Sequence, residues 1–401
     1  MTVSAVMLLG IPVSFLAVNY HAHDRTDNFI AHDYGYNILM SCEPNAILFT
    51  NGDNDTFPLW FLQEVKGIRK DVRVVNLSLL NTKWYIKQLE DYEPKVPIHL
   101  DDRFIEEKLG PMAWPSEEIS AAGISWKLAG CGTQRIRQGD TVQTIHYFRV
   151  QDLMVIRIIQ QNQWKRPIYF AVTVSSDNKI GLEEYLRMEG MVYRLVQTKG
   201  TDQLEPERSR RNLFEVYRYR GIKDPKVYKD KNTRKLLINY RAAYFQLAYT
   251  YQRQGKMDLA FETMKRCEEV MDLSWRGYYT IAQMAHKAGR KEEGLKALRQ
   301  AVALERERDA GVVMSFAYYA NELGDRGEAI RLYRRAAELD PASSRPYYPL
   351  AALLEKQGDY AGALAALERL VQFYPKEEAL KREIKTLRKK MEAVEAKQDS
   401  Q

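Results

Sequence analysis

The chain has 401 residues, of which 45% are hydrophobic, so it is long enough for two domains that each have a core. Its formal net charge of +7 comes from 60 basic and 53 acidic residues. They are spread along the chain without a long basic block or a nucleic-acid-binding motif, which argues against nucleic acid as a partner. Three cysteines are too few for a disulfide framework or a four-cysteine zinc site.

The first 20 residues differ from the rest, because the stretch from Val3 to Val18 contains no charged residue. A helix over residues 1–20 would be roughly 30 Å long at about 1.5 Å per residue, which is just enough for one bilayer crossing. The marks of a secretory signal, a basic start and a small-residue cleavage site, are missing. We therefore expect an uncleaved transmembrane helix at residues 1–20. The alternative is a helix buried in the protein core.

A short polar cluster follows this segment. His21, His23 and Asp24 carry side chains that metals bind, so they are candidate metal ligands. No fourth ligand is evident nearby, and a polar stretch next to a membrane explains the same residues. We expect no cofactor.

The pattern of residues 21–200 predicts an α/β domain with an open, mainly parallel sheet. Residues 46–50 form a short apolar run typical of a buried strand, and a polar turn and a helix with Pro58 in its first turn come next. Strand and helix patterns then continue in the same way. The further expected elements are a strand at 72–77, a helix from near Thr82, a helix at 152–163 and a strand at 167–172.

Polar side chains cluster where the first two expected strands end. In open α/β sheets, ligands bind beyond the carboxyl ends of the strands. Carboxylate and amide oxygens are suited to a divalent cation or to the hydroxyls of a sugar. The alternative is structural, because Asn, Gly and Asp form turns and Asp55 can cap a helix. The candidate ligand-binding residues are Asp53, Asn54, Asp55, Asn81 and Thr82.

Residues 201–239 are rich in Arg, Lys and Tyr and are expected to be a basic linker. From residue 240 to 375 the chain repeats itself, with glycines at intervals of 34, 35 and 34 residues. A small residue stands seven positions before each glycine, and another stands five positions after it. Small side chains let paired helices approach closely, while glycine ends the first helix. The repeat-defining residues are Ala248, Gly255, Ala260; Ala282, Gly289, Gly294; Ala317, Gly324, Ala329; and Ala351, Gly358, Ala363.

The repeated segments resemble the tetratricopeptide repeat, most closely in LGDRGEAIRLYRRAAELDP and QGDYAGALAALERLVQFYP. The resemblance implies an all-α solenoid that binds a protein partner. A solenoid needs a polar outer face at its end. The charged residues 376–401 are therefore expected to form a capping helix.

A second resemblance covers the segment before the repeats. It rests on the run HDRTDNFIAHDYGYNILMSCEPNAILFTNGDNDTFPLWFLQEVKGIRKDVRVVNLSLLNTKWYIKQL and on WKRPIYFAVT. These residues are similar to the C-terminal region of a bacterial multi-span membrane protein family that is itself similar to protein O-mannosyltransferases. The resemblance implies an extracytoplasmic α/β domain followed by tetratricopeptide repeats. It also implies that the catalytic acid lies in a multi-span portion that this chain lacks, so no catalytic residue is assigned.

Two functions follow as expectations. The first is a membrane-anchored, extracytoplasmic module of a glycosyltransferase-like system, whose repeats bind a protein partner or acceptor and whose residues 1–20 contact the membrane. A glycan or lipid-linked sugar is a further partner that the resemblance implies. The second is a sugar- or cation-binding enzyme domain that uses the loop from Asp53 to Asp55. A cytoplasmic repeat scaffold with a buried N-terminal helix is a third alternative.

Overall fold

The computed structural model describes residues 2–113, 117–128, 130, 132–138, 141–200 and 203–398. Three of the expected segments have residues outside this description: Met1 of the transmembrane helix, residues 201–202 of the basic linker and residues 399–401 of the capping helix. The chain forms two compact units, Met1–Thr250 (unit 1) and Tyr251–Gln401 (unit 2). Helix α8 (Lys231–Arg253) runs across the boundary between them.

Unit 1 is built on a five-stranded sheet with the strand order β2-β1-β8-β10-β9. β1 pairs in parallel with both neighbours, through Ile47 opposite Arg73 and Ile47 opposite Ile168. β10 pairs antiparallel with β8 and β9, so the sheet is mixed rather than mainly parallel as predicted. The strands are β1 (Ile47–Thr50), β2 (Arg73–Asn76), β8 (Ile168–Ala171), β9 (Leu186–Met188) and β10 (Val192–Leu195).

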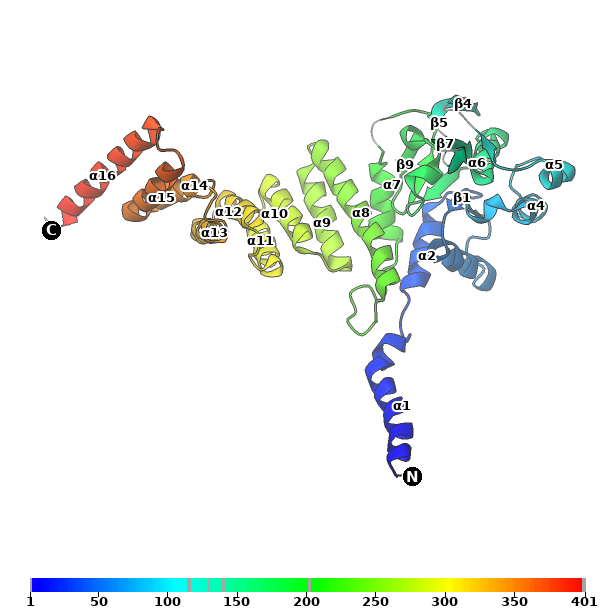
Figure 1. Cartoon of the computed structure of the whole chain (residues 1–401), viewed down its shortest axis with the longest axis horizontal. Coiled ribbons are helices and arrows are strands. Elements are labelled where there is room, and N and C mark those ends of the chain that lie inside the picture. The colour runs from blue at the N-terminus through cyan, green and yellow to red at the C-terminus, as the bar shows by residue number, and fades with distance from the viewer. Residues whose placement is uncertain are drawn as a thin grey trace. The chain divides into compact units, whose positions relative to one another are not determined.

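Helices and turns cover both faces of the sheet, and the central strands are accordingly apolar. All four residues of β1 and of β8 are buried, as in strands that are covered on both faces. Figure 1 shows the helices of this unit around the sheet. They are α2 (Ile30–Ser41), α3 (Asp53–Trp60) with a π-helical turn (Phe61–Val65), α4 (Lys83–Asp91), α5 (Asp102–Glu107), α6 (Val150–Asn162) and α7 (Pro206–Arg211) with a π-helical turn (Asn212–Val216).

Two smaller sheets between α5 and α6 were not predicted. β4 (Glu117–Ala121) and β5 (Ile124–Leu128) form one hairpin. β6 (Gly132–Gln138) and β7 (Thr141–Phe148) form a longer one, with β3 (Met112–Ala113) beside β7. Residues 206–216, in the expected linker, are helical, and Leu213 within them and Tyr217 directly after them are buried in unit 1.

The N-terminal residues form helix α1 (Thr2–His23). Leu16 and Val18 are 66% and 80% exposed. This exposure contradicts the alternative prediction, which was a helix buried in the protein core. Within the described residues, however, no helix combines the length and the apolar character that a bilayer crossing requires. The predicted transmembrane helix is therefore not supported.

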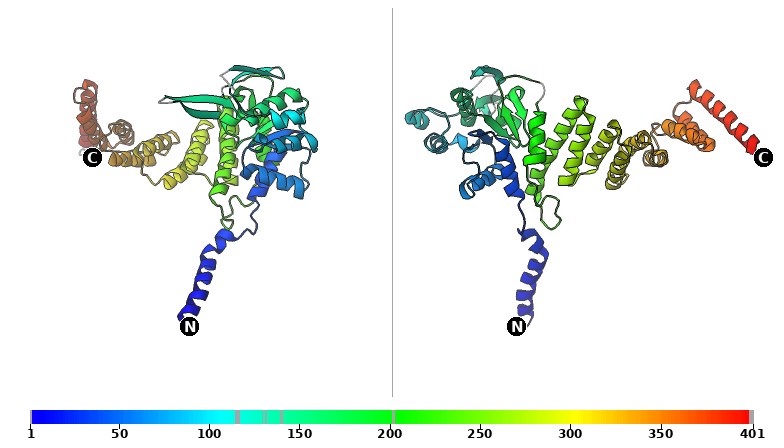
Figure 2. Two further views of the ribbon diagram at one scale, coloured as in Figure 1. Left: turned by 45° about the vertical axis from the view of Figure 1, so that its right-hand side comes forward. Right: turned by 180° about the vertical axis from the view of Figure 1, so that it is seen from behind.

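Unit 2 is a series of helical hairpins, and Figure 2 shows them following one another along the chain. All four repeat glycines take positive φ, at +74°, +73°, +97° and +86° for Gly255, Gly289, Gly324 and Gly358. The small residues beside them are buried, which allows the two helices of a hairpin to pack closely. The helices are α9 (Met257–Val270), α10 (Trp275–Lys287), α11 (Lys291–Glu305), α12 (Ala310–Glu322), α13 (Arg326–Leu339), α14 (Tyr347–Gln357), α15 (Tyr360–Phe373) and α16 (Glu378–Gln398).

The last helix, α16, packs against α15. Its Leu380 and Leu387 are buried, while Arg388 and Lys390 form ion pairs with Glu368 and Glu355. This helix therefore covers the end of the hairpin series with a charged outer surface.

Candidate functional site

The polar residues predicted as a ligand site lie in two different environments. Asp53 and Asn54 are exposed in the first turn of α3, whereas Asp55 is 3% exposed. The Asp55 carboxylate accepts a hydrogen bond from Thr173 Oγ1. Burial raises the pKa of Asp55, and hydrogen bonds from Thr173 and from the backbone of Asn51 and Gly52 only partly oppose this shift. Asp55 thus holds the start of α3 against the end of β8, and Gly52 rather than Asp55 is the N-cap.

The amide side chains near the strand ends form hydrogen bonds with one another. Gln151 N donates to Asn81 Oδ1 at 3.0 Å, and the Gln151 side chain lies 2.8 Å from Asn81 Nδ2. The same side chain lies 2.9 Å from Asn178 Oδ1, and Asn178 Nδ2 donates to Asn51 Oδ1. Thr82 Oγ1 donates to Leu79 O at 2.6 Å. The amides and the hydroxyl therefore link the segments around the sheet instead of facing a ligand.

The structure brings no metal site together in the residues it describes: no group of three or more His, Cys, Asp or Glu side chains is placed to hold an ion. Among the candidate ligands, the carboxylate of Asp24 accepts a hydrogen bond from Thr26 N at 2.8 Å. The ring of His21 packs edge-on against Tyr228 at 5.7 Å. The geometry therefore gives no support to a cation site at either predicted position.

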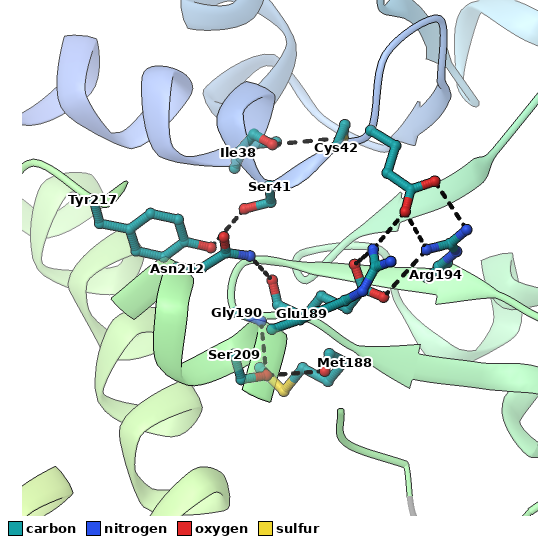
Figure 3. A network of polar contacts seen from close by, with 12 residues as sticks. Ile38, Ser41, Cys42, Met188, Glu189, Gly190, Arg194, Ser209, Asn212 and Tyr217 are labelled. Atoms are coloured by element: carbon teal, nitrogen blue, oxygen red, sulfur yellow. Dashed lines mark hydrogen bonds and ion pairs between the residues drawn. The ribbon is translucent and has the colours of Figure 1, made fainter. Parts of the chain in front are cut away.

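A cluster of charges lies between α2, α7 and the β9–β10 turn (Figure 3). Glu43 pairs with Arg194 at 2.6 and 2.9 Å and with Arg208 at 2.6 Å. Glu189 is 3% exposed and lies 3.3 Å from Arg208 and 3.8 Å from Arg194. Burial raises the pKa of Glu189, and the two arginines act against that shift.

This cluster is structural because its charges balance. Two carboxylates face two guanidinium groups, and the half-exposed Arg208 and the less exposed Arg194 compensate the charge of the buried Glu189. Neutral hydrogen bonds extend the network: Asn212 Nδ2 donates to Glu189 O at 2.8 Å, and the hydroxyls of Ser41 and Tyr217 lie 2.6 Å apart. We assign the cluster to the packing of α2 and α7 onto the sheet.

Exposed aromatic side chains lie on unit 2, where tyrosines occur on the first helices of the hairpins. Tyr318 and Tyr348 are 50% and 53% exposed, on α12 and α14. Tyr319 on α12 packs edge-on against Tyr279 of α10 at 5.4 Å and against Tyr318 at 5.1 Å. We call Tyr279, Tyr318, Tyr319 and Tyr348 the tyrosine row.

Polar groups lie beside the tyrosine row. Gln283 Nε2 donates to the Tyr319 hydroxyl at 3.4 Å, and the His286 ring packs edge-on against Tyr319 at 5.9 Å. His286 Nε2 also lies 3.8 Å from Glu322. Tyrosines with neighbouring amides offer apolar faces together with hydrogen-bonding groups, a combination that suits an extended peptide.

The sequence contains a signal for this row that the sequence analysis did not use. Two of its members, Tyr279 and Tyr348, stand three positions before a repeat-defining alanine, as Met314 does in the repeat between them, and Tyr318 follows Met314 by about one helical turn. Equivalent positions of successive repeats lie on one face of a solenoid. The contact between α10 and α12 is consistent with this arrangement.

Family models of known proteins match both parts of the chain. A family model described as TMEM260-associated domain 2 matches residues 31–107 and 139–212. Models of the tetratricopeptide repeat match residues 242–270, 276–308 and 320–383.

Two curated relatives are similar over short segments. Protein O-mannosyl-transferase tmem260 of Dictyostelium discoideum is 26% identical over 80 residues, which is 20% of this chain and 9% of that protein. Protein O-mannosyl-transferase TMEM260 of Mus musculus is 28% identical over 78 residues, which is 20% of this chain and 11% of that protein. The matched segment thus spans about a tenth of the length of these relatives.

Solved structures with similarity to this chain include tetratricopeptide-repeat proteins. YrrB, described as a TPR protein with an unusual peptide-binding site, is 17% identical, with 38% of this chain and 79% of that chain covered and a TM-score of 0.32. Pseudomonas aeruginosa pilF is 22% identical, with 40% and 74% covered and a TM-score of 0.30. The family and repeat models confirm the predicted resemblance: this chain joins a region that matches the TMEM260-associated domain model, and that is similar to part of two protein O-mannosyl-transferases, to a series of tetratricopeptide repeats.

Proposed function

We propose that the chain is a non-catalytic module of a protein O-mannosyltransferase-like system and that unit 2 holds an extended segment of a protein partner or acceptor on the tyrosine row. The observation that carries the proposal is the exposure of Tyr318 and Tyr348 at about half of their surface, on the first helices of two hairpins. Tyrosine is enriched at protein interfaces because its ring is apolar and its hydroxyl stays polar.

The tyrosine row favours peptide side chains that are apolar or aromatic. The edge-on packing among Tyr279, Tyr318 and Tyr319 fixes the rings before binding, which lowers the entropic cost of ordering them. Gln283 offers amide groups at the same face for the backbone of an extended chain. Both features support a peptide rather than a folded protein surface as the element bound.

A peptide library displayed on phage, selected on the purified full chain, tests this proposal. Selected peptides should bind the wild type, and the double variant Tyr318→Ala, Tyr348→Ala should bind them at least roughly tenfold more weakly, as expected for the loss of interface anchors. Tyr92→Ala is the matched control, because Tyr92 is a 65% exposed tyrosine of unit 1. Unchanged affinity in the double variant, or an equal loss in the control, would contradict the proposal.

The proposal also places the chain outside the cytoplasm, where the resemblance puts the corresponding region of the family. Fusion of alkaline phosphatase to the C-terminus tests this placement, because that enzyme is active only outside the cytoplasm. High activity of the fusion is the expected result. An inactive fusion that accumulates at the same level would show that the placement is wrong.

The enzyme alternative on the loop from Asp53 to Asp55 is weaker. The Asp55 carboxylate already accepts a hydrogen bond from Thr173 Oγ1, and Asp53 is exposed in the same turn. A buried carboxylate that already accepts a hydrogen bond is poorly placed to act on a substrate in solvent.

A further inference from the structure

A cavity of about 570 Å³ lies in unit 1, and none of the candidate ligand-binding residues discussed above lines it. It runs along the outer edge of β2, between the end of α3 and helix α4. Trp60 and Trp84 line it together with Tyr85. Its volume falls within the range of about 300–1,000 Å³ that is usual for small-molecule sites.

The aromatic lining is open to solvent. Trp84 is 58% exposed, although it is a large apolar side chain in the first turn of a helix. Its ring packs edge-on against Tyr85 at 5.5 Å, and that contact fixes its orientation. Trp60 is partly exposed at the end of α3, with its ring 5.9 Å from that of Phe57. Exposed aromatic side chains that gather at a cavity mark a binding site rather than a core.

Most polar groups of the lining are planar. Arg73 donates to Gln88 O at 3.1 Å and to Glu93 O at 3.3 Å, which holds its guanidinium at the cavity wall. In the part of the chain that the structure describes, Arg73 Nε has no hydrogen-bond partner. Glu64 and Gln88 also line the cavity. Guanidinium, carboxylate and amide groups can each bind two adjacent hydroxyls at once.

The charges of the lining cancel. Glu64 and Glu93 oppose Lys70 and Arg73, and Lys70 lies 3.8 Å from Glu64. A phosphorylated or acidic ligand would need an excess of positive charge, which this lining does not provide. The lining therefore fits a neutral ligand.

The edge of β2 is closed to strand addition, which argues against an extended peptide in the cavity. Tyr85 OH accepts from Asn76 N at 3.0 Å and donates to Val74 O at 3.4 Å. Gln63 Nε2 donates to Val72 O at 2.6 Å. These outward-facing backbone groups are therefore already satisfied, and a peptide strand would have to displace them.

We propose that this cavity binds a neutral glycan, with a sugar ring stacked on Trp84 and its hydroxyls bound to Arg73, Gln88 and Glu64. A sugar presents an apolar face of C–H groups and a rim of hydroxyls, which match the indole surface and the planar polar groups. This site is separate from the tyrosine row, so it does not depend on peptide binding by unit 2.

The test titrates the full chain with mannotriose, maltotriose and chitotriose, by calorimetry and by saturation-transfer NMR. At least one of these neutral trisaccharides should bind with a Kd of about 1 mM or tighter. Trp84→Ala should weaken that binding at least roughly tenfold, while Trp84→Phe, which retains an aromatic face, should keep most of it. Phe61→Ala is the control, because Phe61 is a 45% exposed aromatic side chain outside the lining.

Three results would overturn the proposal. The first is that none of the trisaccharides binds at up to about 10 mM. The second is that Trp84→Ala binds them as the wild type does, while circular dichroism shows it folded. The third is that mannose 6-phosphate or a proline-rich peptide binds in a Trp84-dependent manner while the neutral sugars do not; the cavity would then be an anion or peptide site.

Discussion

At the residue scale, Asp53 and Asp55 illustrate how far a local pattern predicts a site. The sequence correctly predicted a buried strand before both aspartates and a helix near them, but it put them in a polar turn, whereas α3 begins at Asp53 and Pro58 lies in its second turn. It could not separate them, because the partner of Asp55 is Thr173, which lies 118 residues further along the chain. The same holds for Asn81, whose partner Gln151 is 70 residues away. Such partners are set by the sheet topology, which the spacing of polar residues does not encode.

Asp55→Ala should lower the free energy of unfolding of unit 1 by roughly 1–3 kcal/mol, because it leaves the Thr173 hydroxyl and two backbone N–H groups without their acceptor. Asp53→Ala should cost less than about 0.5 kcal/mol, as is usual for an exposed position. Urea denaturation followed by tryptophan fluorescence measures both. Equal losses in the two variants would show that Asp55 does not hold α3 against β8.

At the scale of the elements, the helical hairpins were predictable and the β-hairpins were not. A repeat glycine acts within its own turn, so its spacing alone located the turns at Gly255, Gly289, Gly324 and Gly358. The β6–β7 hairpin depends on pairing between two strands, and β6 reads GTQRIRQ, with a single large apolar side chain. Its alternation of apolar and polar residues is too weak to indicate a strand. The antiparallel β9 and β10 escaped prediction for a related reason, since an arginine interrupts the apolar residues of each, whereas β1 and β8 have no charged residue.

Gly324→Ala should destabilise unit 2 by about 1–2 kcal/mol, because an alanine at φ +97° is strained. An added Cβ at Gly324 meets nothing within 4 Å, so the cost would come from the backbone alone. Gly327→Ala is the matched control. It lies inside α13, where an added Cβ meets only Asp325 Oδ1 at 3.9 Å, and alanine is preferred in helices.

Thermal unfolding followed by circular dichroism at 222 nm compares the two glycine variants. The expected order of midpoints is Gly324→Ala below the wild type, with Gly327→Ala at or above it. A midpoint for Gly324→Ala equal to that of the wild type would mean that the turn after α12 does not need the left-handed conformation.

At the scale of the whole molecule, three ion-paired carboxylates make the stability of unit 1 depend on pH. Hydrogen bonds from Arg69 hold the pKa of Asp71 below its usual value. Burial would raise the pKa of Asp33 and of Glu43, but hydrogen bonds from Arg220 to Asp33, and from Arg208 and Arg194 to Glu43, outweigh it and lower both pKa values. All three carboxylates belong to unit 1. A carboxylate with a lowered pKa stabilises the fold above its unfolded pKa, and this contribution is lost as the pH falls through the folded pKa.

Loss of these three contributions should lower the urea midpoint of unit 1 as the pH falls from about 7 to about 3, while Asp55 and Glu189, whose pKa values are raised, act in the opposite direction and make the fall smaller. Tryptophan fluorescence reports mainly on unit 1, because five of the six tryptophans precede residue 250. Asp33→Asn should lower the midpoint at neutral pH, and its difference from the wild type should shrink below the usual Asp pKa of 3.8. Asp53→Asn, at an exposed position, serves as the control. A difference that stays constant with pH would show that the Asp33–Arg220 pair does not act through its charge.

Helix α8 determines how the protein can be divided in the laboratory. Tyr240 and Tyr244 on this helix are buried in unit 1, where Tyr240 OH accepts from Asn37 Nδ2 at 2.7 Å and Tyr244 OH lies 2.9 Å from Tyr219 OH. The helix nevertheless continues to Arg253, beyond the boundary of the unit. An expression clone of the repeats that starts at Lys231 would uncover both tyrosines, and one that starts after Thr250 would cut the helix. Replacing those two tyrosines with polar residues in the longer clone is therefore the rational route to a soluble fragment.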